Sequence, residues 1–462
     1  MFTPKQIAQL NLYHQQGYQF VVAYSGGVDS TVLLYLLNDF CRKINTPLTA
    51  IHIHHGISAN ADYWLEHCKA VTAELNVELT TVRVSINKGP RQSLEALARD
   101  ARYQAIVEHT NNKSIIFTGQ HLDDQTETFL LRLKRGSGPN GLASMREVRN
   151  LAGERVLLRP LLQVSRADIE QYAIEHKIRW IEDESNNDQN FDRNFLRKQI
   201  IPQLNKKWPQ FNQMVQRSAQ LCHDYQLLAN ELAELDSQNC IDAQGCLIVE
   251  RCLSLSETRI NNIVRYWLDQ HCISMPSSKQ MEQIRYAMQS KSDAQPIVRI
   301  AGAELRRFNG KLYILQQVDL EWILHDNADI TIEVDSPIVI NTAQGRALTI
   351  AKVTEGNRVR LPHKDEVVSI RYKVKSSTKC SPHYRQQSRT IKKLLQELSV
   401  EPWFRHKIPY LYYDDNCVAA LGYWIEKTYL VDENSHSNLT GLGWFIEEGF
   451  TKHESNSRSV SL

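Results

Sequence analysis

The chain has 462 residues, 42% of them hydrophobic and 23% charged, with a formal net charge of +2, and this length predicts more than one domain. No apolar stretch reaches the roughly 18 residues of a membrane-spanning helix, and the polar start MFTPKQIAQLNLYHQQ lacks the pattern of a secretory signal. The nine cysteines are odd in number and contain no C-x-x-C pair, which indicates a reduced cytoplasmic protein without a cysteine metal or redox site.

The first part of the chain alternates apolar runs with amphipathic stretches. Predicted strands cover residues 18–24, 48–56, 77–86 and 114–119. Predicted helices cover residues 30–39, 61–75, 93–110 and 123–136, and a loop follows at 136–145. Strands that alternate with helices indicate βαβ units and a parallel sheet.

The remaining sequence changes in character. Helical patterns occupy residues 165–177, 191–205, 210–236 and 256–288, and strand-like patterns occupy 297–317 and 331–352. The acidic stretch 319–335 is typical of a linker. We therefore expect three domains, residues 1–208, 209–330 and 331–450, and a polar, Ser-rich tail at 451–462 that we expect to be disordered.

Positive charge gathers in two segments of this nearly neutral chain. Residues 131–166 contain eight Lys or Arg against two Glu, a net of +6, and residues 356–407 contain thirteen against four Asp or Glu, a net of +9. Two such segments indicate a polyanionic partner, although a solvated charged face is the alternative for either segment alone.

A glycine-rich loop joins the first predicted strand to the first predicted helix. It consists of Ser25, Gly26, Gly27, Val28, Asp29 and Ser30. Glycines let the backbone approach an anion, and the free N–H groups of a helix start favour negative charge. The motifs G-x-x-x-x-G-K-S/T and G-x-G-x-x-G are both absent, so this is neither the kinase-type P-loop nor a dinucleotide fingerprint. A plain strand–helix turn with Ser and Asp caps is the alternative.

The SGGVDS loop after an apolar strand resembles the PP-loop of the N-type ATP pyrophosphatases, which grips the pyrophosphate part of ATP. Further segments follow the order found in tRNA(Ile)-lysidine synthetases: GQHLDDQTET (119–128), GSGPNGLASM (136–145), RPLL (159–162) and RWIEDESNNDQNFDRNFLR (179–197). SLEALARDARY (93–103) and the later segment from GNRVRL to VAALG also fit. The chain differs where many relatives have Gly-His-x-x-Asp-Asp-Gln, because its histidine, His121, is displaced by one position.

The resemblance implies an α/β fold for the first domain, a parallel-sheet PP-loop fold of the adenine nucleotide alpha hydrolase type. It also implies a mostly helical middle domain and a small α+β C-terminal domain. Residues 1–208 would then bind ATP and carry catalysis, residues 209–330 would contact tRNA, and the basic domain at 331–450 would bind tRNA.

The implied reaction uses ATP and Mg²⁺ and acts on an isoleucine tRNA with a CAU anticodon. The C2 oxygen of the wobble cytidine attacks the α-phosphorus of ATP, pyrophosphate leaves, and the ε-amine of free lysine then displaces AMP. Lysidine results, and decoding changes from AUG to AUA. The amine must lose a proton, which a carboxylate or its solvent network accepts. We expect no membrane or DNA partner, and a homodimer stays open.

Carboxylates follow the predicted strand at 114–119. Asp124, Glu127 and Thr128 share one helix face at the end of a parallel strand, where open α/β sheets bind ligands. Carboxylates there can hold Mg²⁺ that bridges ATP oxygens, so we expect Asp29 and Asp124 to be catalytic and to bind the metal. Helix capping is the alternative for Asp124, and Asp123 fits either role.

The resemblance makes Arg102, Glu127 and Arg193 candidate contacts for the substrate. Solvated arginines are the alternative for helix 93–110. The H-x-H-H sequence at residues 52–55 places two histidines on one strand face and the third on the other. No cysteine or carboxylate completes a metal set nearby, so we expect ordinary strand histidines.

The sequence leaves three alternative functions to consider. A PP-loop tRNA thiolase usually needs paired cysteines or an iron–sulfur site, and the sequence has no C-x-x-C. A small-molecule adenylating synthetase of the amidotransferase type would need an ammonia source and would leave the basic last domain unexplained. A non-enzymatic RNA-binding protein would not need Asp29, Ser30 and Asp124.

Overall fold

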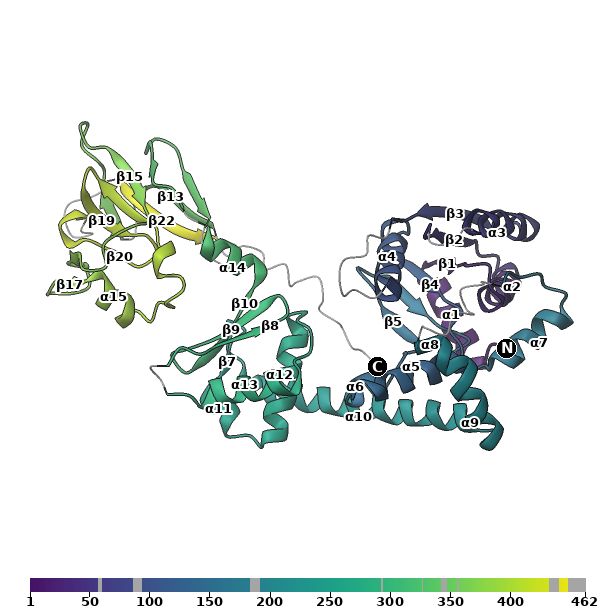
Figure 1. Cartoon of the computed structure of the whole chain (residues 1–462). Helices are drawn as coiled ribbons and strands as arrows, with labels where there is room; N and C mark the ends of the chain where they lie inside the picture. Colours follow the sequence, from purple (N-terminus) through teal and green to yellow (C-terminus); the bar gives the residue numbers. More distant parts are fainter. Residues whose placement is uncertain are drawn as a thin grey trace. The chain divides into compact units, whose positions relative to one another are not determined.

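The computed structural model describes residues 1–56, 60–85, 94–182, 192–291, 294–325, 327–341, 347–354, 357–431 and 440–447. The predicted tail at 451–462 lies outside the described residues. The chain forms two compact units, Met1–Ala229 and a second that begins at Asn230 (Figure 1). None of the described helices combines the length and the apolar character needed to span a bilayer.

A six-stranded sheet forms the centre of the first unit, in the order β3-β2-β1-β4-β6-β5. Its strands are β1 (Gln19–Ala23), β2 (Leu48–His54), β3 (Glu78–Arg83), β4 (Ser114–Phe117), β5 (Val148–Asn150) and β6 (Val156–Leu158). Pairing is parallel from β3 to β6, and β5 joins the edge antiparallel. The predicted parallel α/β fold is therefore confirmed, whereas the β5–β6 hairpin was not predicted from the sequence.

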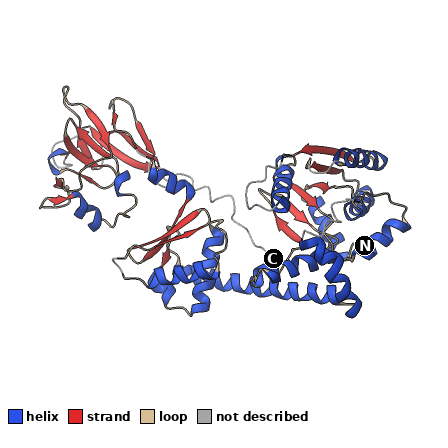
Figure 2. Ribbon diagram, viewed as in Figure 1, coloured by secondary structure: helices blue, strands red, loops and turns tan. Residues whose placement is uncertain are grey.

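Helices cover both faces of this sheet (Figure 2). They are α1 (Pro4–Gln15), α2 (Val28–Lys43), α3 (Ala61–Leu75), α4 (Leu94–Glu108), α5 (Leu122–Lys134), α6 (Pro139–Leu142), α7 (Arg166–Glu175), α8 (Asp192–Phe195), a π-helical turn (Leu196–Ile200), α9 (Ile201–Lys207) and α10 (Phe211–Cys240). Helix α2 lies on one face and α4 on the other, and the last helix of this part of the chain, α10, continues past the unit boundary at Ala229. The predicted loop at 136–145 contains the single turn α6. The predicted helix at 30–39 begins earlier, because extended Gly27 is already the N-cap of α2.

Alternate side chains of β1 enter two different cores. Phe20 and Val22 pack with Leu33 and Leu37 of α2, whereas Val21 packs on the other face with Ile106 of α4. A strand covered on both faces has no solvated side, so its sequence is a continuous apolar run without alternation. This packing fixes the carboxyl end of β1, from which the glycine-rich loop starts.

The second unit begins with helices around a four-stranded sheet in the order β7-β10-β9-β8. Its strands are β7 (Leu247–Ile248), β8 (Ile297–Ile300), β9 (Ala303–Phe308) and β10 (Lys311–Gln316), and its helices are α11 (Val249–Leu253), α12 (Glu257–Gln270), α13 (Ser278–Gln289) and α14 (Gln317–Leu324). The helical pattern at 256–288 is two helices, since Cys272 adopts a φ of 57° and Ser277 caps α13. The predicted linker at 319–335 contains most of α14.

Two five-stranded sheets, β11-β15-β18-β19-β20 and β12-β13-β22-β14-β21, complete the second unit. Their strands are β11 (Ile330–Thr331), β12 (Ile338–Asn341), β13 (Ala347–Val353), β14 (Arg358–Arg360), β15 (Val368–Arg371), β18 (Tyr410–Tyr413), β19 (Asn416–Ala420), β20 (Trp424–Ile425), β21 (Leu430–Val431) and β22 (Gly441–Glu447). A two-stranded ribbon, β16 (Lys379–Cys380) with β17 (Arg389–Thr390), precedes α15 (Ile391–Glu397). The basic segment thus lies in a sheet domain.

Candidate active site

Backbone geometry shapes the glycine-rich loop between β1 and α2. Gly26 has a φ of +88°, a conformation that L side chains rarely adopt, and a Cβ there would lie 3.0 Å from Ile181 Cδ1 and 3.1 Å from Cys68 Sγ. Gly27 caps α2 without a side-chain hydrogen bond, so the first N–H groups of the helix are left for a ligand. This arrangement is a cradle for an anionic group.

Hydroxyl groups brace the loop from within. The Ser30 hydroxyl donates to Gly27 O at 3.0 Å and lies 3.0 Å from Ser25 Oγ. Thr31 Oγ1 donates to the same carbonyl at 2.9 Å. Ser25 is exposed, whereas Ser30 and Val28 are buried. Of the predicted loop residues, Ser25 therefore offers its side chain to a ligand, and Val28 can offer only its backbone.

The segment that follows β4 packs directly against the glycine-rich loop. A Cβ at Gly119 would lie 2.9 Å from the carbonyl carbon of Asp29 and 3.0 Å from Ser30 N. Only glycine permits backbones to approach so closely. The contact brings the segment that follows β4, with His121 and Asp124, against the first turn of α2. Sequence reasoning gave Gly119 no role of its own, because the clash arises between segments about ninety residues apart.

A buried histidine occupies the centre of the resulting site. His121 is 1% exposed, and its Nε2 lies 3.4 Å from Asp124 Oδ2 and 3.6 Å from Asp29 Oδ1. Its Nδ1 lies 3.6 Å from Asp123 Oδ2. Neither ring nitrogen makes a hydrogen bond of ordinary geometry with a described residue. Three carboxylates from two helices thus surround one imidazole.

The electrostatics of this group follow from burial and from charge. Burial lowers the pKa of His121, but the charges of Asp124, Asp29 and Asp123 outweigh it, and the pKa is raised overall. Burial raises the pKa of Asp29, although His121 and Arg166 lower it in part. Burial also raises the pKa of Asp123, but its contact with His121 and the N–H of Arg166 lower it overall. The shifts of His121 and Asp123 favour an imidazolium beside an ionised Asp123, whereas the shift of the pKa of Asp29 favours its neutral form.

Asp123 joins neighbouring elements through both of its carboxylate oxygens. It accepts a hydrogen bond from Arg166 N at 2.9 Å and another from Asn212 Nδ2 at 3.1 Å. Arg166 also extends Nη1 to Asp29 Oδ2 at 3.2 Å. Asp123 therefore ties the starts of α7 and α10 to α5.

Glu127, one turn after Asp124 on α5, is fully buried. Arg197 donates to its Oε1 at 2.6 Å and to its Oε2 at 3.0 Å, and also to Asp124 Oδ1 at 3.0 Å. Arg193 Nε lies 3.5 Å from Glu127 Oε2. Burial lowers the pKa of Arg197, but the hydrogen bond and charge of Glu127, followed by Asp124, raise it overall. Glu127 therefore positions two arginines and, through Arg197, the Asp124 carboxylate.

The structure brings together all but one of the residues predicted to act in chemistry. Asp29, Asp124, Glu127 and Arg193 belong to one connected group. Arg102 lies on α4 with its Nη2 3.5 Å from His55 Nε2, and no hydrogen bond or ion pair with another described residue links it to that group. Sequence reasoning missed Arg166, whose only local signal is its place after the helix cap Ser165.

The histidines of β2 contact a backbone carbonyl, a thiol and a carboxylate, since Cys68 Sγ lies 3.5 Å from His52 Nδ1 and Asp62 lies beside His54. His52 Nδ1 lies 3.0 Å from Tyr24 O, and His54 Nε2 lies 3.2 Å from Asp62 Oδ1. Within the described residues, no cluster of three or more His, Cys, Asp or Glu side chains has the geometry of a metal site. All nine cysteines are free thiols.

Comparison with protein families gives three matches along the chain. A PP-loop domain matches residues 3–204, a TilS substrate binding domain matches 231–313, and a TilS substrate C-terminal domain matches 368–440. The first match coincides with the parallel sheet, the second with the helices and four-stranded sheet, and the third with β15 to β21 of the C-terminal sheet domain.

Curated relatives are similar over nearly their whole length. The tRNA(Ile)-lysidine synthase of Shewanella oneidensis is 40% identical over 448 residues, which are 94% of this chain and 95% of the relative. That of Photorhabdus laumondii is 40% identical over 88% of this chain and 91% of the relative. The tRNA(Ile)-lysidine synthase of Vibrio parahaemolyticus is 38% identical over 91% of this chain and 94% of the relative. With this identity and coverage, and with the loop and carboxylate cluster in place, the chain belongs to the tRNA(Ile)-lysidine synthase family.

Proposed function

We propose that this protein ligates free L-lysine to C2 of the wobble cytidine in an isoleucine tRNA with a CAU anticodon, at the expense of ATP. The observation that carries the proposal is the braced SGGVDS loop, which directly abuts the buried cluster of Asp29, His121 and Asp124 in a chain of this family. We place the reaction in the cytoplasm, consistent with nine free cysteines.

ATP is proposed to lie with its phosphates at the start of α2. The uncapped N–H groups and the exposed Ser25 hydroxyl supply donors for the phosphate oxygens. The loop lacks the lysine that P-loop enzymes place near the γ-phosphate. A grip on the pyrophosphate part leaves the α-phosphorus open to attack, and the products are AMP and pyrophosphate.

Asp29 fits a role in holding Mg²⁺. Its Oδ1 is buried, lies 3.6 Å from His121 Nε2 and makes no hydrogen bond with a described residue, so it keeps lone pairs for a cation. Both Asp124 oxygens already accept, from Arg197 and from His121 N, so Asp124 would contribute through its other lone pairs. Mg²⁺ is commonly held by one or two carboxylates plus substrate phosphates, and when bound it neutralises phosphate charge.

Two displacements make up the proposed chemistry. The C2 oxygen of cytidine attacks the α-phosphorus, and the bond to pyrophosphate breaks. The ε-amine of lysine then attacks C2, the C2–oxygen bond breaks, and AMP leaves with that oxygen. The amine loses a proton to a carboxylate of the site or its solvent. Arg193 and Arg166 supply the positive charge for anionic groups of the substrates, and the role predicted for Arg102 stays a prediction.

The basic C-terminal segment supports tRNA as the partner. Some of its cations have partners, as in the ion pairs Arg360–Glu366 and Arg385–Glu397. Lys375, Lys379, Lys392 and Lys393 are exposed and form no ion pair with a described residue. Pairing of β16 with β17 gathers these four lysines on one ribbon and the helix after it. We propose residues 1–208 as the catalytic domain, 209–330 as a tRNA-contacting domain and 331–450 as the basic tRNA-binding domain.

The test follows both products. The full-length protein is incubated with α-³²P-labelled ATP, Mg²⁺, lysine and the CAU isoleucine tRNA. We expect labelled AMP, and we expect the RNA mass to rise by that of lysine minus one water. Methionine tRNA, which shares the anticodon, is the control. ADP as the sole nucleotide product would contradict the assignment. AMP formation that needs no RNA would favour a small-molecule synthetase, and sulfur incorporation would favour a thiolase.

A further inference from the structure

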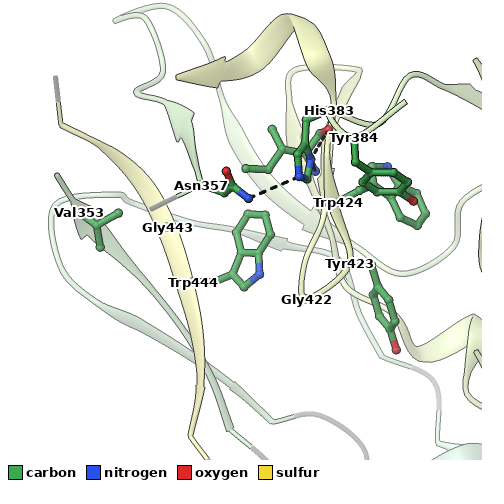
Figure 3. Close-up of a pocket in the computed structure, with 10 residues that line it drawn as sticks. Val353, Asn357, His383, Tyr384, Gly422, Tyr423, Trp424, Gly443 and Trp444 are labelled. Atoms are coloured by element: carbon green, nitrogen blue, oxygen red, sulfur yellow. Dashed lines mark hydrogen bonds between the residues drawn. The ribbon is translucent and has the colours of Figure 1, made fainter. Parts of the chain in front are cut away.

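A cavity of about 480 Å³ opens in the C-terminal part of the second unit, far along the sequence from the catalytic loop (Figure 3). One wall comes from β13 and β22 and carries Trp444. The other wall comes from the turn before β20 and from the loop that carries His383 and Tyr384. Neither the proposed chemistry nor the family comparison assigns this cavity a role.

Aromatic rings line the cavity with part of their surface open to solvent. Trp444 projects from β22 toward the centre, with His383 and Tyr384 across from it and Tyr423 at the rim (Figure 3). Tyr384 is 49% exposed and Tyr423 is 38% exposed. Large aromatic side chains left exposed around one hollow mark a binding surface rather than a core. Flat rings suit a flat ligand.

Polar groups lie beside these rings. Asn357 Nδ2 lies 3.5 Å from His383 Nε2, and His383 Nδ1 accepts a hydrogen bond from Ile425 N at 3.2 Å. The backbone therefore fixes the imidazole, and its outer edge with the Asn357 amide remains at the cavity wall (Figure 3). An amide and an imidazole edge are suited to the hydrogen-bonding edge of a heterocyclic base.

Two lysines lie close in sequence to residues that line the cavity, because Lys427 comes two residues after Ile425 and Lys379 four residues before His383. Lys427 follows β20, and its backbone N–H donates to Ser381 O, two residues beyond Lys379. Both lysines are exposed, and neither forms an ion pair with a described residue. The nearby Glu426 carboxylate is occupied, because Ser381 N donates to its oxygens at 2.7 and 2.8 Å. These two exposed cations are available to the phosphates of an RNA strand that lies along this part of the domain.

We infer that this cavity binds an unpaired nucleobase of the tRNA, stacked among Trp444, Tyr384 and Tyr423 and flanked by phosphates on Lys379 and Lys427. The inference rests on the proposed function, since it names a contact with the same substrate. A base inside a duplex cannot enter such a hollow, whereas an unstacked base can lie against aromatic faces. The cavity would therefore bind only RNA that has an unpaired base. The lysine ribbon would bind the phosphates of single-stranded and double-stranded RNA alike.

The experiment compares ring removal with ring retention in the full-length protein. Binding of a fluorescein-labelled single-stranded RNA hexamer, a blunt RNA duplex and the intact tRNA is measured by anisotropy. Tyr384→Ala and Tyr423→Ala should each weaken hexamer binding roughly tenfold, as expected for loss of one base–aromatic stack. Tyr384→Phe and Tyr423→Phe keep the ring and should bind like the unaltered protein. The duplex should bind equally to all variants.

Controls separate this inference from the proposed function. Tyr63→Ala removes a 70% exposed ring from α3 of the first unit and should change nothing. AMP formation at saturating tRNA should keep its kcat in the Ala variants, with a raised KM for tRNA. Absence of lysidine from the unaltered protein would overturn the proposed function without touching the hexamer comparison. Equal hexamer affinity of the Ala variants and the unaltered protein, or equal losses in the Phe variants, would overturn the base pocket.

Discussion

The two charged regions of this chain differ in how far their charged side chains are buried and paired. In the first unit, His121 and Glu127 are 1% and 0% exposed, and the arginines of the group reach it from distant segments, since Arg197 bonds Glu127 and Arg166 bonds Asp29. In the C-terminal sheet domain, the four lysines of the β16–β17 ribbon and α15 are exposed and lack ion pairs with described residues. A buried charge needs a partner at the right distance, because burying an unpaired charge costs several kcal/mol of stability. Exposed cations instead attract anions over a longer range, and salt weakens that attraction.

This contrast predicts two kinds of mutational response. Each substitution in the buried group should remove one specific contact and should have a large effect on catalysis or on stability. Changes in the exposed lysines should be graded, additive and salt-dependent.

Asp29→Ala and Asp124→Ala should have the largest effects. Each removes a carboxylate that we place at the ATP phosphates. A loss of several kcal/mol in the transition state corresponds to roughly a thousandfold or more in rate. AMP formation should fall by that factor, while tRNA affinity stays unchanged. Asp39→Ala, a 69% exposed residue on the same helix as Asp29, is the matched control. Full activity in the Asp124 variant would show that residue to be only a cap.

Glu127→Gln should have the next largest effect, on stability. The variant leaves Arg197 and Arg193, which are 27% and 29% exposed, beside a neutral amide, and losing a hydrogen bond between charged groups costs about 1.5–3 kcal/mol. Chemical denaturation of the full chain should show the transition of the first unit displaced by that free energy. Glu66→Gln, on an exposed helix face, should stay within about 0.5 kcal/mol. An equally small change at Glu127 would mean that the buried pair contributes little.

Neutralising the lysine ribbon should give a smaller, graded effect. Lys375, Lys379, Lys392 and Lys393 are replaced by Gln one after another, and tRNA affinity is measured across salt concentrations. Each lysine that contacts a phosphate should reduce the log–log slope by about 0.7–0.9. Lys43→Gln and Lys69→Gln are controls. An unchanged slope after all four replacements would show that these charges only solvate the domain.

Substitution is a better test of this domain than truncation before residue 356. Strands β12 and β13 pair antiparallel in one sheet, and β13 pairs with β22. A cut there would leave β12 and β13 without β22. The resulting loss of tRNA binding would report unfolding of the sheet rather than removal of the positive charge.

The smallest effect should be a pH dependence of stability carried by His121. Its pKa is raised in the folded state, so its stabilising contribution is complete below the unfolded value of about 6.5 and is lost as the pH rises through the higher folded value. Thermal unfolding between pH 6 and pH 9 should therefore show a falling component that His121→Gln lacks. Exposed His176→Gln should keep the component. A His121 variant with the same profile would contradict the raised pKa.

Local patterns predicted what lies within one or two elements. The apolar run of β1, the glycine loop and the start of α2 adjoin in the sequence, so their order reveals a phosphate cradle. Asp124 and Glu127 share a helix face because they are three residues apart. The break inside 256–288 was missed, because two amphipathic helices joined by a short turn resemble one helix when only periodicity is considered.

The sequence by itself determined the parallel α/β fold, the anion-binding loop and the basic character of the last domain, since these depend on periodicity, glycine placement and composition. Only the tertiary structure decided that Arg166 pairs with Asp29, 137 residues away, that Gly119 abuts the loop and that Arg102 stays apart from the cluster. It also decided which aromatic residues of the C-terminal domain line one cavity. The physical reason is that backbone rules act over a few residues, whereas ion pairs and cavities form between surfaces that meet only after the layers have packed.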